Sequence, residues 1–542
     1  MIQAGRNLSV RALHNYDEQG NRIDKGAHAR GNASGGCAGL AGNGTFVEAV
    51  ASPEVEAVIG SGVTTGSGDI DIIARANNDA LAEAPSLTIG FSGGVGVALA
   101  DAEASGSILA HLDAGDSVAG GNVLIESQVS SRADARSEAS GGGIFSGNGS
   151  VATAKSSPVI EAAVRGGSLD AGGNVALSSR SEGDASADAQ GITIGLAGGV
   201  GVNLATADVS PTLSTYIDGV VTAGQDITLQ SLHNRHADGS LLDGQAHASG
   251  NSSGGGLFGG GGVDVDAIAS ASVDSYIAGG TVTTTSGDIR LIARSSDNAL
   301  AEADGLIIGG VAIGANLADA TVEGTTRAHV DAGTTLSSGR DLTILADAVA
   351  SGEAKAVASS GGLAAGAGAD ADALVAPHVE ATLDTGASAL RDVNITARGI
   401  AHARAEAKGS SIGLGLSAGA SFADARALPV ITSAIGAGHT VTAGRDINLG
   451  SVLNTDTDGT PLGDYTAQAA STGSAGSLLV GILAGAEASV TSTAEVKSSI
   501  GGGSTLEADN DIRLSSNADN TVDVRAEGDA NGLFAGGGSS ST

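Results

Sequence analysis

Large and reactive side chains are scarce in this sequence. Its 542 residues contain no Trp, 6 Phe, 4 Tyr, 7 Pro and 1 Cys. A compact domain needs large side chains to fill the space between its layers, so this composition argues against a series of ordinary globular cores. Enzymes that cleave acidic polysaccharides on a β-helix commonly use clustered carboxylates and aromatic platforms, so we do not expect an enzyme.

Positive charge and long apolar runs are also scarce. There are 26 Lys and Arg against 60 Asp and Glu, which gives a formal net charge of −34. Such a chain repels phosphate groups, so we expect no nucleic-acid partner and no binding to anionic membranes. The run "GSLLVGILAGA" is too short and Gly-rich to cross a bilayer, so no membrane insertion is expected. The start "MIQAGRNLSV" lacks the apolar core of a signal peptide, so any export signal is expected outside this segment.

A repeat dominates what is present. An Asp or Asn followed by alternating apolar residues recurs ten times, with spacings of 62, 53, 52, 52, 62, 53, 51, 54 and 65 residues. The positions are Asn7, Asp69, Asn122, Asn174, Asp226, Asp288, Asp341, Asp392, Asp446 and Asp511. Internal repeats of this length are typical of stacked architectures.

A longer rhythm groups the ten units. Each long unit is followed by three shorter ones, and "LHNYDEQGNRIDKGAHARGNASGG" in the first unit parallels "LHNRHADGSLLDGQAHASGNSSGG" in the fifth. We therefore expect a four-unit block over 1–225, a second over 226–445 and a partial third over 446–542, all parts of one continuous stack.

The order of events within a unit predicts strands. A period-two alternation is followed by a Gly-rich span, a second alternation and a Gly/Thr turn. This pattern favours strands joined at a tight reversal. Five prolines share one place in the unit, a strand entrance where a missing N–H is tolerated; they are Pro53, Pro158, Pro211, Pro377 and Pro429.

The predicted fold is therefore all-β: an elongated repeat β-solenoid, specifically a right-handed parallel β-helix with hairpin-like excursions. With one to three coils per unit it would be a rod on the order of 45–145 Å long, at roughly 4.8 Å per coil. We favour two or three coils per unit.

The stretch "GNVALSSRSEGDASADAQGITIGLAGGVGVNLATADVSPTLSTYIDGVVTAGQDITL" resembles the repetitive shaft of very large bacterial surface adhesins, the filamentous-haemagglutinin and leukotoxin-type filamentous adhesin group. The resemblance covers nearly the whole chain and is one of style and periodicity. It implies secretion across a Gram-negative outer membrane, a location at the cell surface, and a role in attachment or biofilm. The secretion domain of that family and a separate receptor-binding head are absent from this sequence.

An insertion lengthens the first, fifth and ninth units, at Asn15–Lys25, Asn234–Asp243 and Asn454–Asp464. In the third copy, oxygen-bearing residues alternate before Gly459 as in a calcium loop; the candidate ligands are Asn454, Asp456, Asp458 and Asp464. The twelfth loop position is Tyr465 rather than an acid, and Asn, Asp and Gly also favour turns without metal, so a simple reversal is the alternative. The inserts are also candidate contact loops, represented by Asn15, Asp17, Asn234 and Asp238.

Other motifs are weaker. "GGGGVDVDAI" is a single loose approach to the calcium-binding nonapeptide of β-rolls, and the Asp or Asn that opens each unit is expected to form a turn-forming ladder without a ligand. His233 and His236 lack further zinc ligands at suitable spacing and are expected at the surface. Cys37 is expected to be a buried or partly buried thiol rather than a nucleophile.

Two functions follow. The first is a structural stalk of a secreted adhesin, without a cofactor unless calcium binds, that extends a binding element from the cell. The second is a binding or assembly module that contacts a host, a neighbouring cell or a sister chain end to end, since an open stack end exposes an unpaired strand edge.

Overall fold

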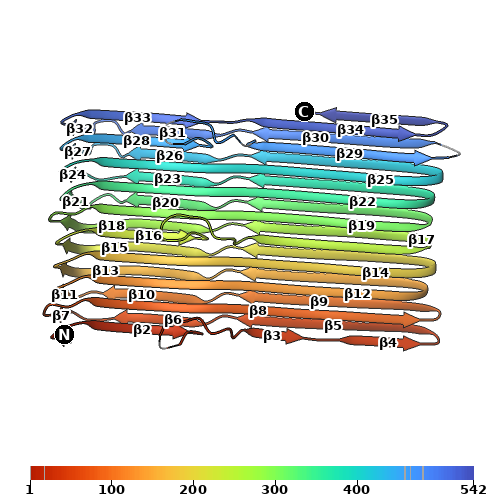
Figure 1. Ribbon diagram of the computed structural model, residues 1–542, viewed down its shortest axis with the longest axis horizontal. Coiled ribbons are helices and arrows are strands. Elements are labelled where there is room, and N and C mark those ends of the chain that lie inside the picture. The colour runs from red at the N-terminus through yellow and green to blue at the C-terminus, as the bar shows by residue number, and fades with distance from the viewer. Residues whose placement is uncertain (1, 18, 457–458, 464, 479–480) are drawn as a thin grey trace.

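The computed structural model is all-β and describes the chain except for residues 1, 18, 457–458, 464 and 479–480. No helix occurs among the described residues, and so none that could cross a membrane. Neighbouring strands run parallel and lie one above another from the N-terminal to the C-terminal end (Figure 1). The all-β prediction is confirmed.

Each repeat unit forms one layer of the stack. In layer 2, β8 (Ile70–Gly90) runs outward, the chain reverses, β9 (Gly93–Ala104) returns, and β10 (Ser107–Asp113) continues into a second sheet. Ile70 of β8 pairs with Val123 of β12 (Val123–Ser156), the equivalent position one repeat later. We number the layers by their repeat and call the Gly-rich turn between the outward and return runs the reversal. The expectation of two or three coils per unit is wrong, because each run is far longer than the usual strand of five or six residues.

The strands of the outward and return runs are hydrogen-bonded into one set. Six long strands in this set continue through the reversal and so belong to both runs. They are β2 (Leu8–His14), β3 (Ala27–Arg30), β4 (Ala33–Cys37), β5 (Leu40–Ala51), β8, β9, β12, β14 (Val175–Val209), β16 (Ile227–His233), β17 (Ala246–Ala269), β19 (Ile289–Val322), β22 (Leu342–Val375), β25 (Val393–Ala427), β28 (Asp446–Leu453), β29 (Ala467–Ser477), β30 (Ile482–Ser492), β33 (Asp511–Ala518), β34 (Val522–Asn531) and β35 (Ala535–Ser541).

A second sheet completes each layer at the end opposite the reversal. Its strands are β1 (Ile2–Ala4), β6 (Glu54–Ile59), β7 (Val63–Thr65), β10, β11 (Asp116–Ala119), β13 (Val159–Ala171), β15 (Thr212–Ala223), β18 (Ser272–Thr284), β20 (Thr325–Val330), β21 (Thr335–Ser338), β23 (His378–Leu383), β24 (Ala387–Ala389), β26 (Val430–Ile435), β27 (Thr440–Ala443), β31 (Glu495–Ile500) and β32 (Thr505–Ala508).

The proportions of the molecule follow from one layer per repeat. Ten layers at roughly 4.8 Å each give a stack of about 45 Å, whereas the 21 residues of β8 extend about 70 Å. The longest axis therefore runs along the strands and not along the stack (Figure 1).

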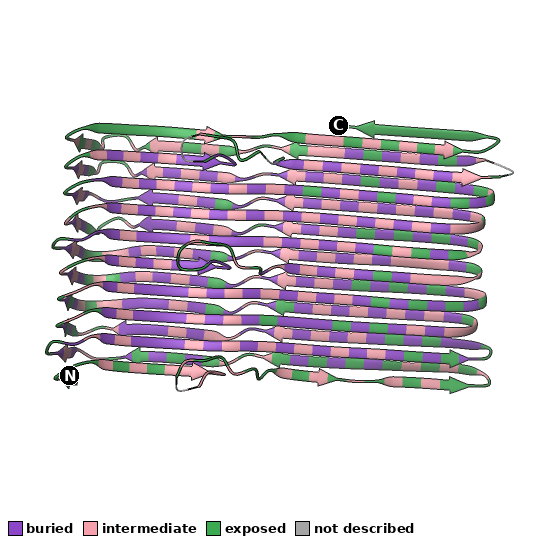
Figure 2. Ribbon diagram, viewed as in Figure 1, coloured by how far each residue is buried: buried purple, intermediate pink, exposed green. Residues whose placement is uncertain are grey.

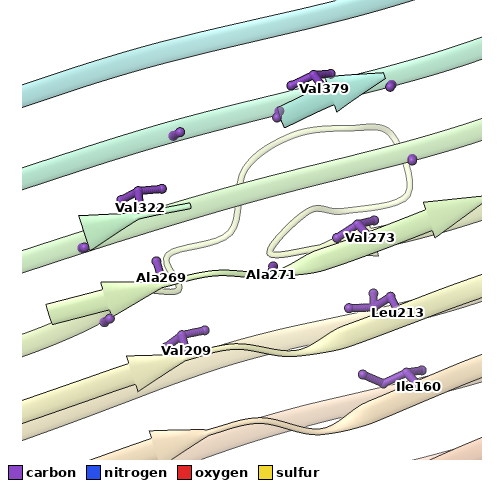
Figure 3. Close-up of a cluster of buried hydrophobic side chains, with 14 of the residues drawn as sticks. Ile160, Val209, Leu213, Ala269, Ala271, Val273, Val322 and Val379 are labelled. Carbon is purple, nitrogen blue, oxygen red and sulfur yellow. The ribbon is translucent and has the colours of Figure 1, made fainter. Parts of the chain in front are cut away.

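The core narrows from one end of every layer to the other. Near the second sheet, Ile160, Leu213 and Val273 lie one above another and are at most 1% exposed (Figure 3). Further along the outward run the buried positions are alanines, such as Ala135 and Ala187. Outward-facing and inward-facing residues alternate along the runs (Figure 2). The abundance of Ala thus reflects two runs that come too close together for larger side chains.

At several inward positions close to the reversal even Ala does not fit, although Thr193 and Ile307 are buried there in other layers. A Cβ on Gly409 would lie 2.1 Å from the carbonyl oxygen of Ala420 on the facing return run, and one on Gly473 would lie 1.9 Å from the oxygen of Gly485. These inward glycines are required because the two backbones meet there.

The shared proline position is confirmed as a strand entrance. Pro158 lies between β12 and β13, and its carbonyl accepts a 2.9 Å hydrogen bond from the Thr212 N–H of the next layer. Pro53 and Pro377 act in the same way towards Ser107 and Val430. The carbonyl of each proline thus accepts a hydrogen bond from the next layer. The N–H that proline lacks is tolerated at this strand entrance.

The narrowing core predicts that inward and outward glycines respond differently to substitution. Gly409→Ala must push the facing run away, and we expect it to lower the free energy of unfolding by about 1–3 kcal/mol. Gly366→Ala is the control, because a Cβ there meets nothing within 4 Å. It should be neutral or slightly stabilising. Urea unfolding followed by circular dichroism measures both, and equal effects would contradict the narrowing.

Candidate functional site: ladder, insert hairpins and acidic column

A continuous ladder of Asp and Asn side chains joins all ten layers. In each of nine steps, the backbone N–H of the Asp or Asn that opens a unit donates to Oδ1 of the equivalent residue one layer earlier, over 2.7–3.2 Å. The chain turns into the outward run at this point, so the side-chain oxygen provides the acceptor for that amide. The predicted ladder is confirmed.

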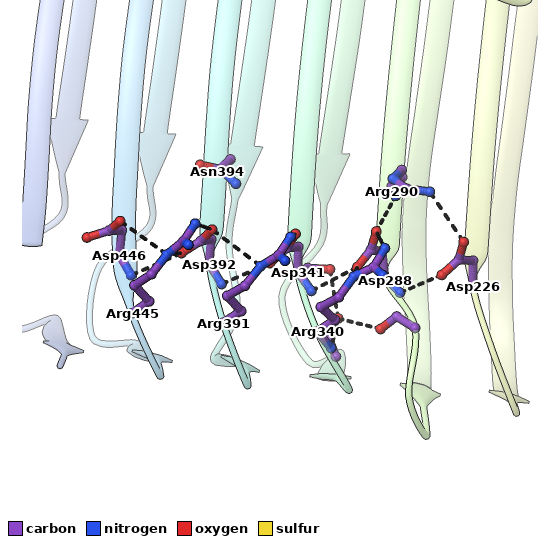
Figure 4. Close-up of polar contacts among 12 residues, drawn as sticks. Asp226, Asp288, Arg290, Arg340, Asp341, Arg391, Asp392, Asn394, Arg445 and Asp446 are labelled. Atoms are coloured by element: carbon purple, nitrogen blue, oxygen red, sulfur yellow. Dashed lines mark hydrogen bonds and ion pairs between the residues drawn. The ribbon is translucent and has the colours of Figure 1, made fainter. Parts of the chain in front are cut away.

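Arginines accompany the ladder where consecutive rungs are Asp. Nε of Arg391 donates to Oδ1 of Asp341 over 2.7 Å, and Nε of Arg445 donates to Oδ1 of Asp392 over 2.8 Å (Figure 4). In both pairs a second guanidinium nitrogen contacts the other carboxylate oxygen, which gives a two-point ion pair between successive layers. Stacked carboxylates one layer apart would otherwise repel each other.

Asp288 shows the electrostatic balance of the ladder. Its side chain is 2% exposed, and burial by itself raises its pKa. The hydrogen bonds from Arg340 and from the Asp341 amide, with the nearby charge of Arg290, outweigh burial and lower the pKa below its usual value. The ionised form of Asp288 is therefore the one that the folded ladder stabilises.

The insert hairpins share one backbone design. Asn15, Asn234 and Asn454 open them with φ of 55°, 49° and 51°, a left-handed conformation that Asn tolerates better than most residues. Single antiparallel bridges close all three, for example between Arg235 and Leu241.

The opening Asn also replaces the backbone hydrogen bonds between layers that the insert interrupts. Oδ1 of Asn234 accepts from the Gly183 N–H over 2.8 Å, and its Nδ2 donates to the Gly183 carbonyl over 3.3 Å. Asn454 makes the same pair of contacts with Ala401, over 2.9 and 3.3 Å. A carboxamide has the donor and acceptor of a peptide group, so it replaces the backbone where the chain leaves the sheet.

The four proposed calcium ligands are not brought together by the described part of the chain. Asn454 is buried, with its carboxamide on Ala401, while Asp456 lies in the hairpin. Asp458 and Asp464 lie outside the described residues. Calcium binding at the third insert therefore stays a prediction.

The candidate contact residues divide by exposure. Asn234 is 1% exposed and Asn15 is half-buried, whereas Asp238 is exposed. Asp17 accepts from the Asn21 side chain and backbone, and these contacts lower its pKa, so it also organises its own turn. The first hairpin lies along the flank of the stack, since its Arg22 forms an ion pair with Glu182 of layer 4. Asp238 is the exposed member of the four, Asp17 is as half-buried as Asn15, and a contact role for these residues stays a prediction.

Two smaller expectations from the sequence are wrong. His233 is fully buried, because it lies at the end of β16 beneath the insert hairpin, and burial lowers its pKa to about 3. Its Nε2 lies 3.7 Å from Oδ1 of the buried Asp297. Cys37 is exposed rather than buried, because it ends β4 next to the reversal of the first layer.

An acidic column runs across four layers of the return run. Asp266, Asp319, Asp372 and Asp424 occupy equivalent positions in layers 5 to 8. Carboxylate oxygens of Asp264, Asp266 and Asp319 lie within 4.8 Å of one another, so these three could hold a metal ion. Burial and then the charges of Asp372 and Asp266 raise the pKa of Asp319 to about 6.

The sequence contains a signal for this column that the β-roll comparison does not detect. Asp264 and Asp266 belong to "GGGGVDVDAI". Aligning that stretch with the same place in the next three units brings the other acids into line. The residues that align are Asp319, Asp372 and Asp424.

No protein-family model, no curated protein and no solved structure matches this chain in the comparisons made with it.

The ladder predicts that Asp392 supports two layers at once. Asp392→Ala leaves the Asp446 amide and the Arg445 guanidinium without their acceptor, and we expect it to lower the free energy of unfolding by about 2–3 kcal/mol. Asp392→Asn keeps an oxygen for the amide and should lose about half of that. Urea unfolding measures both against Asp218→Ala, an exposed carboxylate outside the ladder. The ladder has no energetic role if the two Asp392 variants match this control.

The acidic column predicts a pH-dependent gain on removing one charge. Because the pKa of Asp319 in the folded state, about 6, lies above its ordinary 3.8, its ionisation costs stability. That cost is complete above pH 6 and disappears below pH 3.8. Asp319→Asn should therefore raise the free energy of unfolding at pH 8 by about 1 kcal/mol, after allowance for solvent screening, and have no effect at pH 4. Thermal melts at both pH values test this, and a pH-independent gain would contradict it.

Proposed function

We propose that this chain is a structural segment of a large, secreted bacterial adhesin, in which the layers form a right-handed parallel β-solenoid that carries a binding element away from the cell surface. The observation that supports the proposal most is the unbroken ladder of nine side-chain steps, because it ties every repeat to the next in one register. A stack built in this way can be lengthened by adding repeats without changing its contacts.

Cooperative stacking suits a load-bearing shaft. One hydrophobic cluster, which includes Val47 of layer 1 and Ala488 of layer 9, runs through the stack. Each layer is hydrogen-bonded to its neighbours along its whole length rather than at one point. Pulling on one end therefore loads many parallel hydrogen bonds at once.

One layer per repeat makes the shaft wide and short for its mass. Roughly 52 residues add only about 4.8 Å of height, so a long shaft requires a very large protein. That requirement accords with the resemblance to giant surface adhesins. The width of each layer also makes the flanks a larger share of the molecular surface than in a slender rod.

We further propose calcium as the cation that the carboxylates of Asp264, Asp266 and Asp319 would take, since hard oxygen ligands suit it. Calcium would relieve the repulsion along the acidic column. It should raise the melting temperature of the native chain at pH 8 more than that of the Asp319→Asn variant. Equal shifts would exclude this site.

A block deletion tests the shaft proposal. Removing residues 226–445 takes out four whole layers and brings Gln225 before Asp446, which restores an Asp to the ladder position. We expect a folded protein that is about 20 Å shorter along the stack by small-angle scattering, with its strand-direction width unchanged. In the full-length protein on cells, attachment should persist, because the removed block is only a spacer.

The outcomes separate shaft from binding module. Loss of attachment by a shortened protein that is folded and displayed at normal levels would place the binding surface within 226–445. Surface labelling of intact cells with an antibody against this chain is the matched control for display. Failure to detect the native chain outside the cell would contradict the adhesin proposal itself.

A further inference from the structure

All six phenylalanines of this chain are exposed. They are 49% to 73% exposed and lie in the half of the layers that contains the reversal; they are Phe46, Phe91, Phe145, Phe258, Phe422 and Phe534. Phe is normally among the most buried residue types, and here the core is filled with Ala, Val, Ile and Leu instead. The scarce aromatic residues thus contribute to a surface and not to the core.

The same end of the molecule carries no charge. Each layer passes its reversal with at least 13 consecutive residues that include no Asp, Glu, Lys, Arg or His, for example "QGITIGLAGGVGVNLATA" in layer 4 and "GLIIGGVAIGANLA" in layer 6. In a chain with a net charge of −34, an uncharged end on every layer is a marked departure from the rest of the surface. Large exposed apolar patches of this kind are typical of interaction sites.

The apolar side chains on the outward run form ridges. Leu87 with Ile89, Ile192 with Ile194, and Leu306 with Ile308 project from layers 2, 4 and 6, and each side chain is 48% to 66% exposed. Ile412 of layer 8 continues the series.

Small residues occupy the layers between the ridges. Ser140 and Gly142, Ser253 and Gly255, and Ser359 and Gly361 are the register partners of the ridge residues in layers 3, 5 and 7. Ridges and grooves therefore alternate with a period of two layers, about 9.6 Å.

The fold does not require these outward glycines. None of Gly142, Gly255 and Gly361 has a positive φ. A Cβ added to them would come no closer than 3.4 Å to any neighbour, which is ordinary contact, unlike the 2.1 Å clash at the inward Gly409. Glycine in a strand often marks a bulge, as beside Gly142 and Gly361, or a place where another backbone approaches closely.

We propose that this ridged face of the outward run docks a second copy of the chain, with the ridges of one copy seated in the Ser/Gly grooves of the other. The face is self-complementary because both copies have the same spacing, and a two-fold axis lets ridge meet groove in both directions at once. Sheet faces pack about 10 Å apart, a gap that interleaved Leu and Ile side chains can fill.

Electrostatics favour this face over the opposite one. On the return run the acidic column lies near the reversal and would repel a second copy. On the outward run the nearest charges are of both signs, and two of the basic ones are paired, Lys355 with Glu302 and Lys408 with Glu406, beside the acids Asp188 and Asp304. The exposed large apolar side chains of this half of the layers are divided between the outward run, the reversal and the return run, and those on the outward run form the apolar centre of the proposed interface.

The proposal predicts a dimer that two opposite kinds of substitution disrupt. Sedimentation equilibrium of the native chain should give twice the 51.8 kDa mass at micromolar concentration. Ile194→Lys charges a ridge and Gly142→Val fills a groove, and each should raise the dimer dissociation constant by about 100-fold or more. Val220→Lys is the control, because Val220 is 43% exposed in layer 4 but lies at the end away from the reversal. It should leave the dimer intact.

Other results would overturn the proposal. Circular dichroism and melting temperature establish that each variant is folded. A native chain that stays monomeric at 100 μM, or a dimer that persists in both Ile194→Lys and Gly142→Val, excludes this face as a dimer interface. A monomer that binds neutral phosphatidylcholine vesicles, and loses this binding on Ile194→Lys, would identify a lipid surface as the occupant instead. The block deletion measures stack height and cell attachment, whereas this experiment measures dimerisation. The two proposals can therefore fail independently.

Discussion

The constraint on which this structure depends is the exact superposition of equivalent residues one layer apart. Parallel pairing places each side chain above its counterpart in the preceding repeat. The same packing and charge requirements therefore recur at equivalent positions of every layer. The Asp/Asn ladder fixes that register at the start of the outward run, where a slip of one residue would turn every buried side chain outward. Asn234 and Asn454, which open the second and third insert hairpins, preserve this register where the chain departs from the sheet.

Stacking of this kind makes charge a collective problem. A single Asp at the surface is harmless, but four in register repel each other, and burial together with the charges of Asp372 and Asp266 raises the pKa of Asp319 to about 6. The ladder solves the same problem with arginines, because each Arg that precedes a ladder Asp reaches back to the carboxylate of the layer before. The acidic column has only Arg426 beside Asp424 as a close basic partner among the described residues, which is why it is the better place for a cation.

The narrowing of the layers explains a composition that looks unlike that of a folded protein. Large aliphatic residues fill the wide end, Ala fills the middle, and at positions such as Gly409 and Gly473 inward glycines allow the two runs to approach closely near the reversal. The six phenylalanines lie outside this core, where they add to an uncharged surface. No close approach of the facing run explains the outward glycines between the ridges. Inward glycines therefore serve the packing of the layer, whereas the outward glycines leave room for the proposed second copy.

The repeat spacing was sufficient to predict the strands, the reversal at the Gly-rich span, the proline entrance and the ladder, because each depends on local periodicity. The path of one layer was not predictable in the same way: a run of about twenty alternating residues is compatible with one long strand or several short ones, and only the pairing of Ile70 with Val123 decides. The burial of His233, the meeting of Asp264 with Asp319 and the ridges at Ile194 all arise between layers. The sequence by itself therefore determined what each layer contains, since alternation and turn residues act within a repeat. The tertiary structure decided which residues of different layers become neighbours, because that depends on how far the chain travels before it returns.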